Sequence, residues 1–437
     1  MMYENTRAWA RHADAQDPLR SFQKEFHFPK HNGKRALYFC GNSLGLQPKN
    51  TEGYVKKELD YWKKYGVEGW FEGESPWLSY HKKLSELAAP IVGAKADEVI
   101  VMNTLTVNLH LLMVSFYCPT KERFKIIMEG GAFPSDQYAI ETQVRHHGFD
   151  PSVSIIEVMP REGEYTLRTE DIVQTIESQG NTLALVLLSG VNYYTGQFYD
   201  MKKITEATHR TGAYAGFDLA HAAGNVPLSL HDWQVDFAAW CTYKYLNSGP
   251  GGVGGAFIHE KHFKPQNHLA PQSSKSENPA YLNRFAGWWG HDEAERFKME
   301  KGFVPMPGAA GWQISTAQVI PFAMHKASLE LFEKAGGVSV LREKSWKLTG
   351  YLAFLLQKST QNLKIITPLP DGQESSVSDE HGCQLCILTD LNGKKLFDHL
   401  IKNGVICDWR EPNVIRLAPV PLYNSFEDVW RVGQLML

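Results

Sequence analysis

Between about residues 97 and 260, short apolar runs alternate with segments whose apolar positions have a helical spacing. Continuous apolar runs indicate strands buried on both faces, and helices between them indicate a parallel or mixed sheet with helices on both sides. We therefore expect an α/β fold, in which ligands bind beyond the carboxyl ends of the strands. The predicted strands cover residues 98–102, 124–128, 153–158, 183–188, 214–218, 237–242 and 255–258.

A helix is predicted in front of this region. From Thr51 onward, Val55, Leu59 and Trp62 fall at the spacing of an amphipathic helix, which stops near Gly66.

Beyond about residue 320 the pattern changes to long helical stretches followed by short strand-like runs. The helical stretches cover residues 317–334 and 341–358, which indicates a second, smaller α+β lobe. We expect an N-terminal arm over residues 1–50 that packs with the small domain, a large domain over 51–320 and a small domain over 321–437.

Composition and charge narrow the class of protein. A chain of 437 residues exceeds the usual limit for one hydrophobic core, and 43% hydrophobic with 21% charged residues is ordinary for a globular enzyme. A net charge of -3, with basic residues scattered among acids, provides no face for nucleic acid. The polar start and the absence of a long apolar stretch predict a cytoplasmic protein without a secretory signal or membrane anchor.

The six cysteines lie mostly in apolar surroundings and are expected to be free thiols. Cys383 and Cys386 have the spacing of metal ligands, but no second pair accompanies them. Their flanks also indicate a strand, which would point the two thiols to opposite faces. We therefore expect no metal site.

The most informative chemistry is an acid and a lysine at the ends of two predicted strands. Asp218 and Lys244 are costly charges at such positions unless they are paired or functional. Pyridoxal 5'-phosphate accounts for both, because Asp218 would pair with the protonated ring nitrogen and Lys244 would form the imine. Taken singly, Lys244 could be a solvated loop residue and Asp218 a helix cap. His221 is either a core histidine or a support for the acid and the ring.

A glycine run follows the lysine. Residues 249–254 match the letters of the dinucleotide fingerprint G-x-G-x-x-G, which keeps an NAD enzyme as a weak rival. However, a predicted strand follows these glycines directly, where the fingerprint requires a helix.

A phosphate site is expected where the strand over residues 98–102 turns into a helix near Thr104. Free backbone N–H groups at the helix N-terminus, with Thr104 and Thr106 as hydroxyl donors, would bind the phosphate, although simple capping by Thr104 explains the pattern equally well. Phe133 follows the next strand and could stack on a flat heterocycle or belong to the core.

Beyond these features, the sequence resembles the kynureninases, which are fold-type I pyridoxal-phosphate enzymes similar to class-V aminotransferases. The resemblance covers nearly the whole chain. The segments that carry it are Gly41-Asn-Ser-Leu-Gly-Leu-Gln-Pro48, Met102-Asn-Thr-Leu-Thr-Val-Asn-Leu-His110, Phe133-Pro-Ser-Asp136, Ser189-Gly-Val-Asn-Tyr-Tyr-Thr-Gly-Gln197, Gly216 to Ala222, Tyr243-Lys-Tyr-Leu-Asn247, Trp288-Trp-Gly-His291 and Arg416-Leu-Ala-Pro-Val-Pro-Leu-Tyr-Asn-Ser425.

The resemblance implies a large domain on a mostly parallel seven-stranded sheet, and it implies roles for individual residues. Lys244 and Tyr243 would be catalytic. Trp288 and Thr316 would come from the neighbouring subunit of a homodimer. The cofactor would be bound by Leu105, Thr106, Phe133, Pro134, Ser135, Asp136, Ser189, Asp218, His221, Tyr243, Lys244, Trp288 and Thr316, and the substrate by Arg416, Asn42, Val67 and Ser315.

The implied activity is hydrolytic Cβ–Cγ cleavage of L-kynurenine, 3-hydroxy-L-kynurenine or both, in tryptophan catabolism and NAD biosynthesis. The products would be L-alanine and anthranilate or 3-hydroxyanthranilate. Val67 and Thr316 resemble forms that prefer kynurenine, whereas Ser315 resembles forms that prefer the hydroxylated substrate. The ring-hydroxyl preference therefore stays open, with a lean towards kynurenine.

Two alternatives to a kynureninase would also bind pyridoxal phosphate, and the first of them keeps Asp218 and Lys244. Another fold-type I enzyme, such as a cysteine desulfurase or an aminotransferase, should show a reactive loop cysteine or a second carboxylate pocket, and no exposed candidate cysteine is evident. A non-catalytic cofactor-binding protein would have lost Lys244, Tyr243 or Arg416, all of which are present.

Overall fold

The computed structural model describes residues 2–263, 282–359, 363–369, 380–390 and 392–437. All seven strands that the apolar pattern predicts are present, with ends within two residues of the expected positions. Among the described residues, no helix is both long and apolar enough to cross a membrane.

The seven strands form one sheet in the order β4-β10-β9-β8-β7-β5-β6. The pairs from β9 to β6 are parallel, whereas β10 runs antiparallel to both of its neighbours. The α/β fold with a mostly parallel sheet is thereby confirmed. The strands are β4 (Val99–Val101), β5 (Lys125–Glu129), β6 (Ile155–Val158), β7 (Leu183–Ser189), β8 (Tyr214–Asp218), β9 (Phe237–Cys241) and β10 (Gly254–Ile258).

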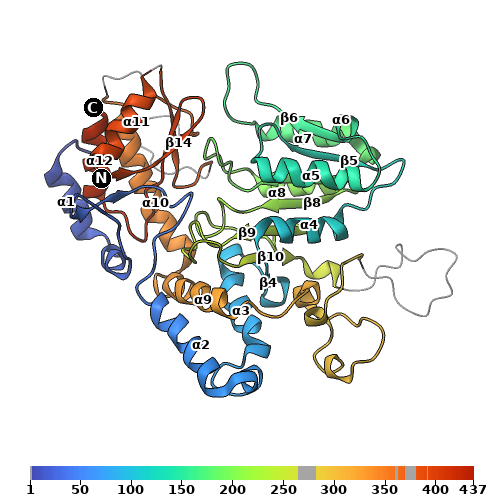
Figure 1. Cartoon of the computed structure of the whole chain (residues 1–437). Coiled ribbons are helices and arrows are strands. Elements are labelled where there is room, and N and C mark those ends of the chain that lie inside the picture. Colours follow the sequence, from blue (N-terminus) through green and yellow to red (C-terminus); the bar gives the residue numbers. More distant parts are fainter. Residues whose placement is uncertain (1, 264–281, 360–362, 370–379, 391) are drawn as a thin grey trace.

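Helices surround this sheet, and the C-terminal lobe lies beside it (Figure 1). The predicted helix after Thr51 is α2, and the two predicted long helices are α9 and α10. The helices of the first two thirds of the chain are α1 (Arg7–Gln16), α2 (Thr51–Tyr65), α3 (Tyr80–Val92), α4 (Leu105–Phe116), α5 (Pro134–His146), α6 (Pro151–Ser154), α7 (Thr169–Gln179) and α8 (Met201–Arg210). The later helices are α9 (Val319–Lys334), α10 (Gly337–Leu356), α11 (Gly393–Lys402) and α12 (Phe426–Met436).

The C-terminal lobe contains a second sheet of four antiparallel strands in the order β11-β12-β15-β14. Its strands are β11 (Lys364–Ile365), β12 (Leu385–Leu388), β14 (Asp408–Arg410) and β15 (Val414–Leu417). The N-terminal segment touches this lobe, since β3 (Leu37–Tyr38) pairs with β13 (Val405–Ile406) and Arg7 of α1 bonds Glu427 of α12. A short hairpin, β1 (Lys30–His31) with β2 (Lys34–Arg35), precedes β3. The domain boundaries near residues 50 and 320 remain our proposal.

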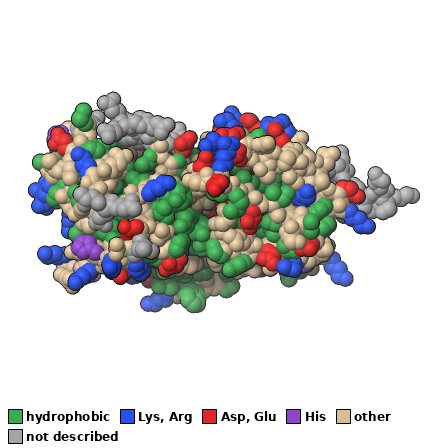
Figure 2. Space-filling view, turned by 90° about the horizontal axis from the view of Figure 1, so that it is seen from above, with side chains coloured by type: hydrophobic (Ala, Val, Ile, Leu, Met, Phe, Trp, Pro, Cys, Tyr) green, Lys and Arg blue, Asp and Glu red, His purple; other side chains and the backbone are tan. Residues whose placement is uncertain are grey.

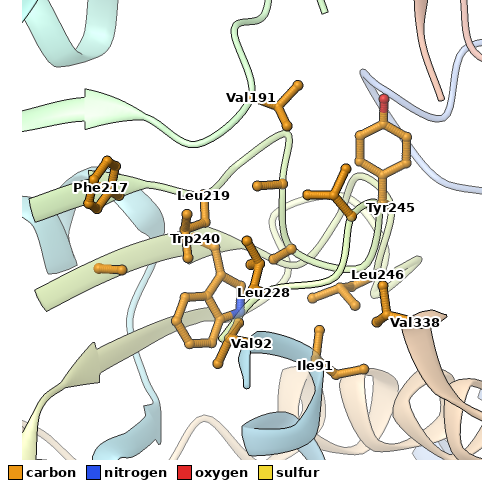
Figure 3. Packing of buried hydrophobic residues seen from close by; sticks show 14 of the residues in the cluster. Ile91, Val92, Val191, Phe217, Leu219, Leu228, Trp240, Tyr245, Leu246 and Val338 are labelled. Atoms are coloured by element: carbon orange, nitrogen blue, oxygen red, sulfur yellow. The ribbon is translucent and has the colours of Figure 1, made fainter. Parts of the chain in front are cut away.

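The core of the large lobe lies between the sheet and the helices that cover it. Phe217 of β8 and Trp240 of β9 are fully buried. In Figure 3, Trp240 lies above Val92 at the end of α3, while Val338 of α10 approaches the same cluster from the other side. Burying side chains of this size contributes about 1.5–3 kcal/mol each, so the loops at the strand ends rest on a rigid support.

Part of the apolar side of α2 is left uncovered by the residues that the structure describes. Leu59 is 47% and Trp62 66% exposed, whereas Glu58 is buried and accepts a hydrogen bond from the Trp77 indole at 2.7 Å. The predicted helix is therefore present, but its apolar residues face outward. Space-filling Figure 2 shows hydrophobic side chains gathered near the middle of one face, with acidic and basic side chains intermingled around them.

Two buried histidines, His81 and His381, are expected to make the folded protein less stable in acid. Burial lowers the pKa of both His81 and His381 to about 4, whereas an unfolded histidine titrates near about 6.5. Between about pH 6.5 and pH 4 each histidine binds a proton in the unfolded chain but not in the folded chain. The free energy of unfolding therefore falls as the pH falls. We expect each histidine to lower the free energy of unfolding by about 2 kcal/mol between about pH 7 and pH 5.

Urea unfolding at both pH values measures this effect. His81→Gln should lose less stability on acidification than wild type, whatever its stability at neutral pH. An equal loss in the variant and in wild type would contradict the assignment to His81.

Candidate active site

The carboxyl ends of the parallel strands place several polar side chains around one cavity of about 190 Å³. β7 ends at Ser189 and β8 at Asp218, and these two residues are direct partners in the strand register. Lys244 follows β9. The cavity is lined by Thr104, Leu105, Thr106, Glu129, Phe133, Ser135, Asp136, Ser189, Val191, Tyr193, Asp218, Ala220, His221, Tyr243 and Lys244.

Lys244 lies against a neutral histidine. Its Nζ is 3.0 Å from Nε2 of His221, and burial, followed by the charge of Lys244, lowers the pKa of His221 well below its usual value. The donor and acceptor in this contact are set by the tautomer of the neutral His221 ring. The buried Nδ1 of His221 has no protein partner. The contact orients the lysine amine toward the cavity.

Two buried carboxyl groups share the far side of the cavity. Burial, and then the charge of Asp218, raises the pKa of Asp136 well above its usual value, and a hydrogen bond joins the two groups. Burial also raises the pKa of Asp218, which accepts 2.6 Å from the Ala220 backbone N–H. Oδ1 of Asp136 has no partner. Such a pair holds one proton between the two groups and offers a favourable place for a cation.

Glu129 is a third acid in this group, at the end of β5. It accepts from the Ser189 hydroxyl at 2.5 Å and from the Ser189 backbone N–H at 3.1 Å. Burial raises its pKa. Glu129 therefore determines where the Ser189 side chain points.

The N-terminus of helix α4 also borders the cavity. Thr104 occupies the N-cap of α4 without a side-chain hydrogen bond to the helix, so simple capping does not describe this threonine. Thr106 and Ser135 hydroxyls lie 2.8 Å apart. Burial raises the pKa of Tyr243, which keeps its phenol protonated as a donor. Free N–H groups and hydroxyls at a helix N-terminus favour a phosphate.

Phe133 is 40% exposed and lies over the cavity. Nζ of Lys244 is 5.7 Å from the centre of its ring, and the ring of Tyr193 meets it edge-on at 5.3 Å. Of the two alternatives left open for Phe133, the ring at the cavity describes this structure and the core residue does not.

The N-terminal segment packs directly on the lysine turn. The Gly45 N–H donates to the Tyr243 carbonyl at 2.8 Å, and a Cβ at Gly45 would approach the Lys244 carbonyl oxygen to 2.3 Å. Only glycine fits this contact. In the same segment, Asn42 is fully buried, and neither of its amide atoms has a partner.

Arg416 does not line the cavity but is buried next to it. Its Nη1 donates to the Tyr193 carbonyl at 2.7 Å, and Tyr193 is a cavity residue. Its charge also contributes to the lowered pKa of His221.

Four of the predicted site residues are exposed and lie outside the cavity of this chain. Val67 is 71% and Trp288 46% exposed, and Ser315 and Thr316 are exposed as well. Pro134 begins α5 beside the cavity without lining it. Their roles stay predictions.

Sequence reasoning missed Glu129, Tyr193 and Asp408. Asp218 was found because it is an acid at the end of an apolar strand. Glu129 has the same position at the end of its strand and could have been found in the same way. Tyr193 belongs to one of the motifs quoted above. Asp408, which binds Arg416 through its carboxylate, has no local signal, because its partner is defined only by strand pairing.

These residues fit pyridoxal phosphate. A cation is favoured at the Asp218 carboxyl pair, an anion at the start of α4, and a flat ring beneath Phe133, with the Lys244 amine between them. The glycines at 249–254 are followed directly by β10, so the strand–helix context of a dinucleotide site is absent there.

The sheet order and this site define the class, a fold-type I pyridoxal-phosphate enzyme. A solved complex of the cystine C–S lyase C-DES with cysteine persulfide has a TM-score of 0.73 at 15% identity, covering 92% of this chain and 97% of its own. A cysteine desulfurase from Thermococcus onnurineus has a TM-score of 0.69 at 16% identity, covering 100% and 98%. At these identities the likeness shows the fold.

The sequence comparisons define the family. Residues 79–377 match the aminotransferase class-V family, and residues 341–436 match the kynureninase C-terminal domain. The kynureninase of Flavobacterium psychrophilum is 52% identical, covering 100% of this chain and 98% of its own. The kynureninases of Myxococcus xanthus and Nematostella vectensis are 51% and 48% identical, each covering 98% of this chain and 96% and 92% of their own. The chain belongs to the kynureninase family.

Proposed function

We propose that this protein is a pyridoxal-phosphate-dependent kynureninase, which hydrolyses the Cβ–Cγ bond of L-kynurenine, 3-hydroxy-L-kynurenine or both. The products are L-alanine and anthranilate or 3-hydroxyanthranilate. The observation that carries the proposal is the identity of about half of all residues along the full length of curated kynureninases. No cysteine lines the described cavity, which does not favour desulfurase chemistry.

In this proposal each end of the cavity binds one part of the cofactor. Asp218, supported by Asp136, binds the protonated ring nitrogen. The N-terminus of α4, with Leu105 and Thr106, and the Tyr243 phenol bind the phosphate. Phe133 and Ser189, the latter held by Glu129, line the cavity and would contact the cofactor ring. When bound, the cofactor acts as a sink for the electrons released at the substrate Cα.

The remaining residues handle the substrate and its protons. Arg416 binds the α-carboxylate by a bidentate contact suited to guanidinium. Lys244, oriented by His221, removes the α-proton and returns it. Tyr243 keeps its proton because of its raised pKa, so it can donate that proton during water addition to the aryl ketone. Asn42 supplies one donor and one acceptor near the same site.

We further propose that the working protein is a homodimer in which Trp288 and Thr316 complete the partner's site. Trp288, Phe297 and Phe71 form an exposed aromatic group, in which the Phe297 ring centre lies 5.5 Å from that of Trp288 and 5.9 Å from that of Phe71. Exposed aromatic side chains that contact one another favour an interface. Light scattering that gives the mass of one chain would contradict the dimer.

The cytoplasmic location also stays a prediction. Fractionation of cells that express the tagged protein tests it, and recovery in the membrane or secreted fraction would contradict it.

The function is tested by supplying both substrates at equal concentration and separating the products by chromatography. We expect alanine in equal amount to the aminobenzoate released, with anthranilate exceeding 3-hydroxyanthranilate. A protein that binds the cofactor but splits neither substrate would keep the class and overturn the activity.

A further inference from the structure

Arg416 has a buried ion pair that the activity described above does not explain. Asp408 on β14 is the direct cross-strand partner of Arg416 on β15. Its carboxylate accepts from Nε at 3.1 Å and from Nη2 at 2.5 Å, which is a bidentate contact along one edge of the guanidinium. The Arg416 side chain is 1% exposed and that of Asp408 9%.

Counting the N–H donors of the Arg416 guanidinium shows which of its edges could bind a carboxylate. A guanidinium has five N–H donors. Asp408 takes the Nε donor and one Nη2 donor, and the Tyr193 carbonyl takes one from Nη1 at 2.7 Å. The second Nη2 donor makes only a long contact of 3.4 Å with the Ser43 hydroxyl oxygen, and the second Nη1 donor has no partner among the described residues. Two parallel donors on one edge match one carboxylate.

The Asp408 carboxylate is itself held in place. It accepts from the Ser43 hydroxyl at 2.6 Å and pairs with Nε of Arg410 at 3.0 Å. Burial alone would raise its pKa, but the hydrogen bond and the charge of Arg416 hold that pKa below its usual value. With one acid and two arginines, the group retains one net positive charge, which suits a single carboxylate.

Asn42 gives an independent sign that a ligand belongs here. It precedes Ser43 in the chain, is fully buried, and leaves both its amide oxygen and its amide nitrogen without a partner. Leaving buried polar groups unpaired costs about 1–3 kcal/mol each, unless a ligand supplies the partner.

We propose that Asp408 is a positioning residue that sets the plane of the Arg416 guanidinium, so that only its end-on edge meets the substrate α-carboxylate. This inference rests on the proposed function, because it assumes that the substrate is an α-amino acid. Asp408 touches no reacting atom. It selects substrates that carry a carboxylate by orienting the residue that binds it.

The test compares L-alanine with L-alaninamide, which differ in the carboxylate. Dissociation constants for both are measured by calorimetry on the protein loaded with pyridoxal phosphate. We expect wild type to bind alanine at least about tenfold more tightly than alaninamide, since a bidentate charged contact is worth that much. Asp408→Asn should lower this ratio by about tenfold, with KM for kynurenine rising far more than kcat falls.

Two variants act as controls. Asp408→Glu keeps the charge and should preserve more of the preference than Asp408→Asn. Asp398→Asn makes the same charge change at an exposed position of α11 and should leave the ratio unchanged. If Asp408→Asn does not fold, as judged by its thermal melt, Ser43→Ala replaces it. Loss of the Ser43 hydroxyl should weaken the preference by about threefold.

The outcomes separate this inference from the proposed function. An Asp408→Asn protein that keeps the wild-type ratio, or a wild type without any preference for alanine, overturns the role of Asp408. Wild type could cleave neither kynurenine nor 3-hydroxykynurenine while Asp408→Asn still loses the preference for alanine over alaninamide. In that case the positioning role stands and the proposed substrate fails.

Discussion

Lys244→Ala is expected to lower kcat for kynurenine by more than about a thousandfold, because the variant loses both the covalent hold on the cofactor and the base at Cα. His221 would face an empty space in place of the amine that lies 3.0 Å away. The variant should still fold, since the lysine side chain lines a cavity.

The spectrum of the purified protein and mass spectrometry after borohydride reduction provide readouts that do not depend on turnover. Wild type should show visible absorbance and a cofactor adduct on the peptide that contains Lys244, and the variant should show neither. Lys202→Ala, at an exposed lysine of α8, is the matched control and should behave as wild type. An adduct on another lysine would contradict the assignment.

Asp218→Asn is expected to lower kcat by about a hundredfold. A close opposite charge shifts a pKa by about 1–3 units, so without it the ring nitrogen loses its proton near neutral pH and stores electrons poorly. The Tm of the cofactor-free protein, in contrast, should stay the same or rise. In the absence of cofactor, burial raises the pKa of Asp218, so a neutral amide avoids burying a charge there while its oxygen can still accept a hydrogen bond from Asp136.

Kinetics of the loaded protein and melting curves of the cofactor-free protein measure these two effects. The combination of lost activity and an unchanged or higher Tm is specific to a functional charge. Asp232→Asn, at an exposed aspartate, should change neither quantity. A variant that loses stability to the same degree as activity would show that Asp218 is structural.

Much of the large lobe could be predicted from local pattern. Buried strands are apolar along their whole length, so all seven were visible as apolar runs, and Asp218 was visible as a charge that ends one of them. The same rule applied to Glu129 would have found a third acid of the cavity. The small-lobe helices followed from periodicity in the same way.

The exposed side of α2 shows a limit of what the apolar spacing can predict. The spacing of Leu59 and Trp62 predicts a helix and an apolar face, and the helix is present. Spacing does not say what covers that face. In this chain nothing among the described residues buries Trp62, which is 66% exposed.

The sequence by itself determined the elements of the large sheet, the acid and the lysine at its strand ends, and the family. These depend on local spacing and on residues that are neighbours in the chain. Only the tertiary structure decided that Asp136 forms a hydrogen bond with Asp218, that His221 contacts Lys244, and that Asp408 occupies one edge of Arg416. The physical reason is that burial and strand register set these pairings, and both arise only when distant segments pack together.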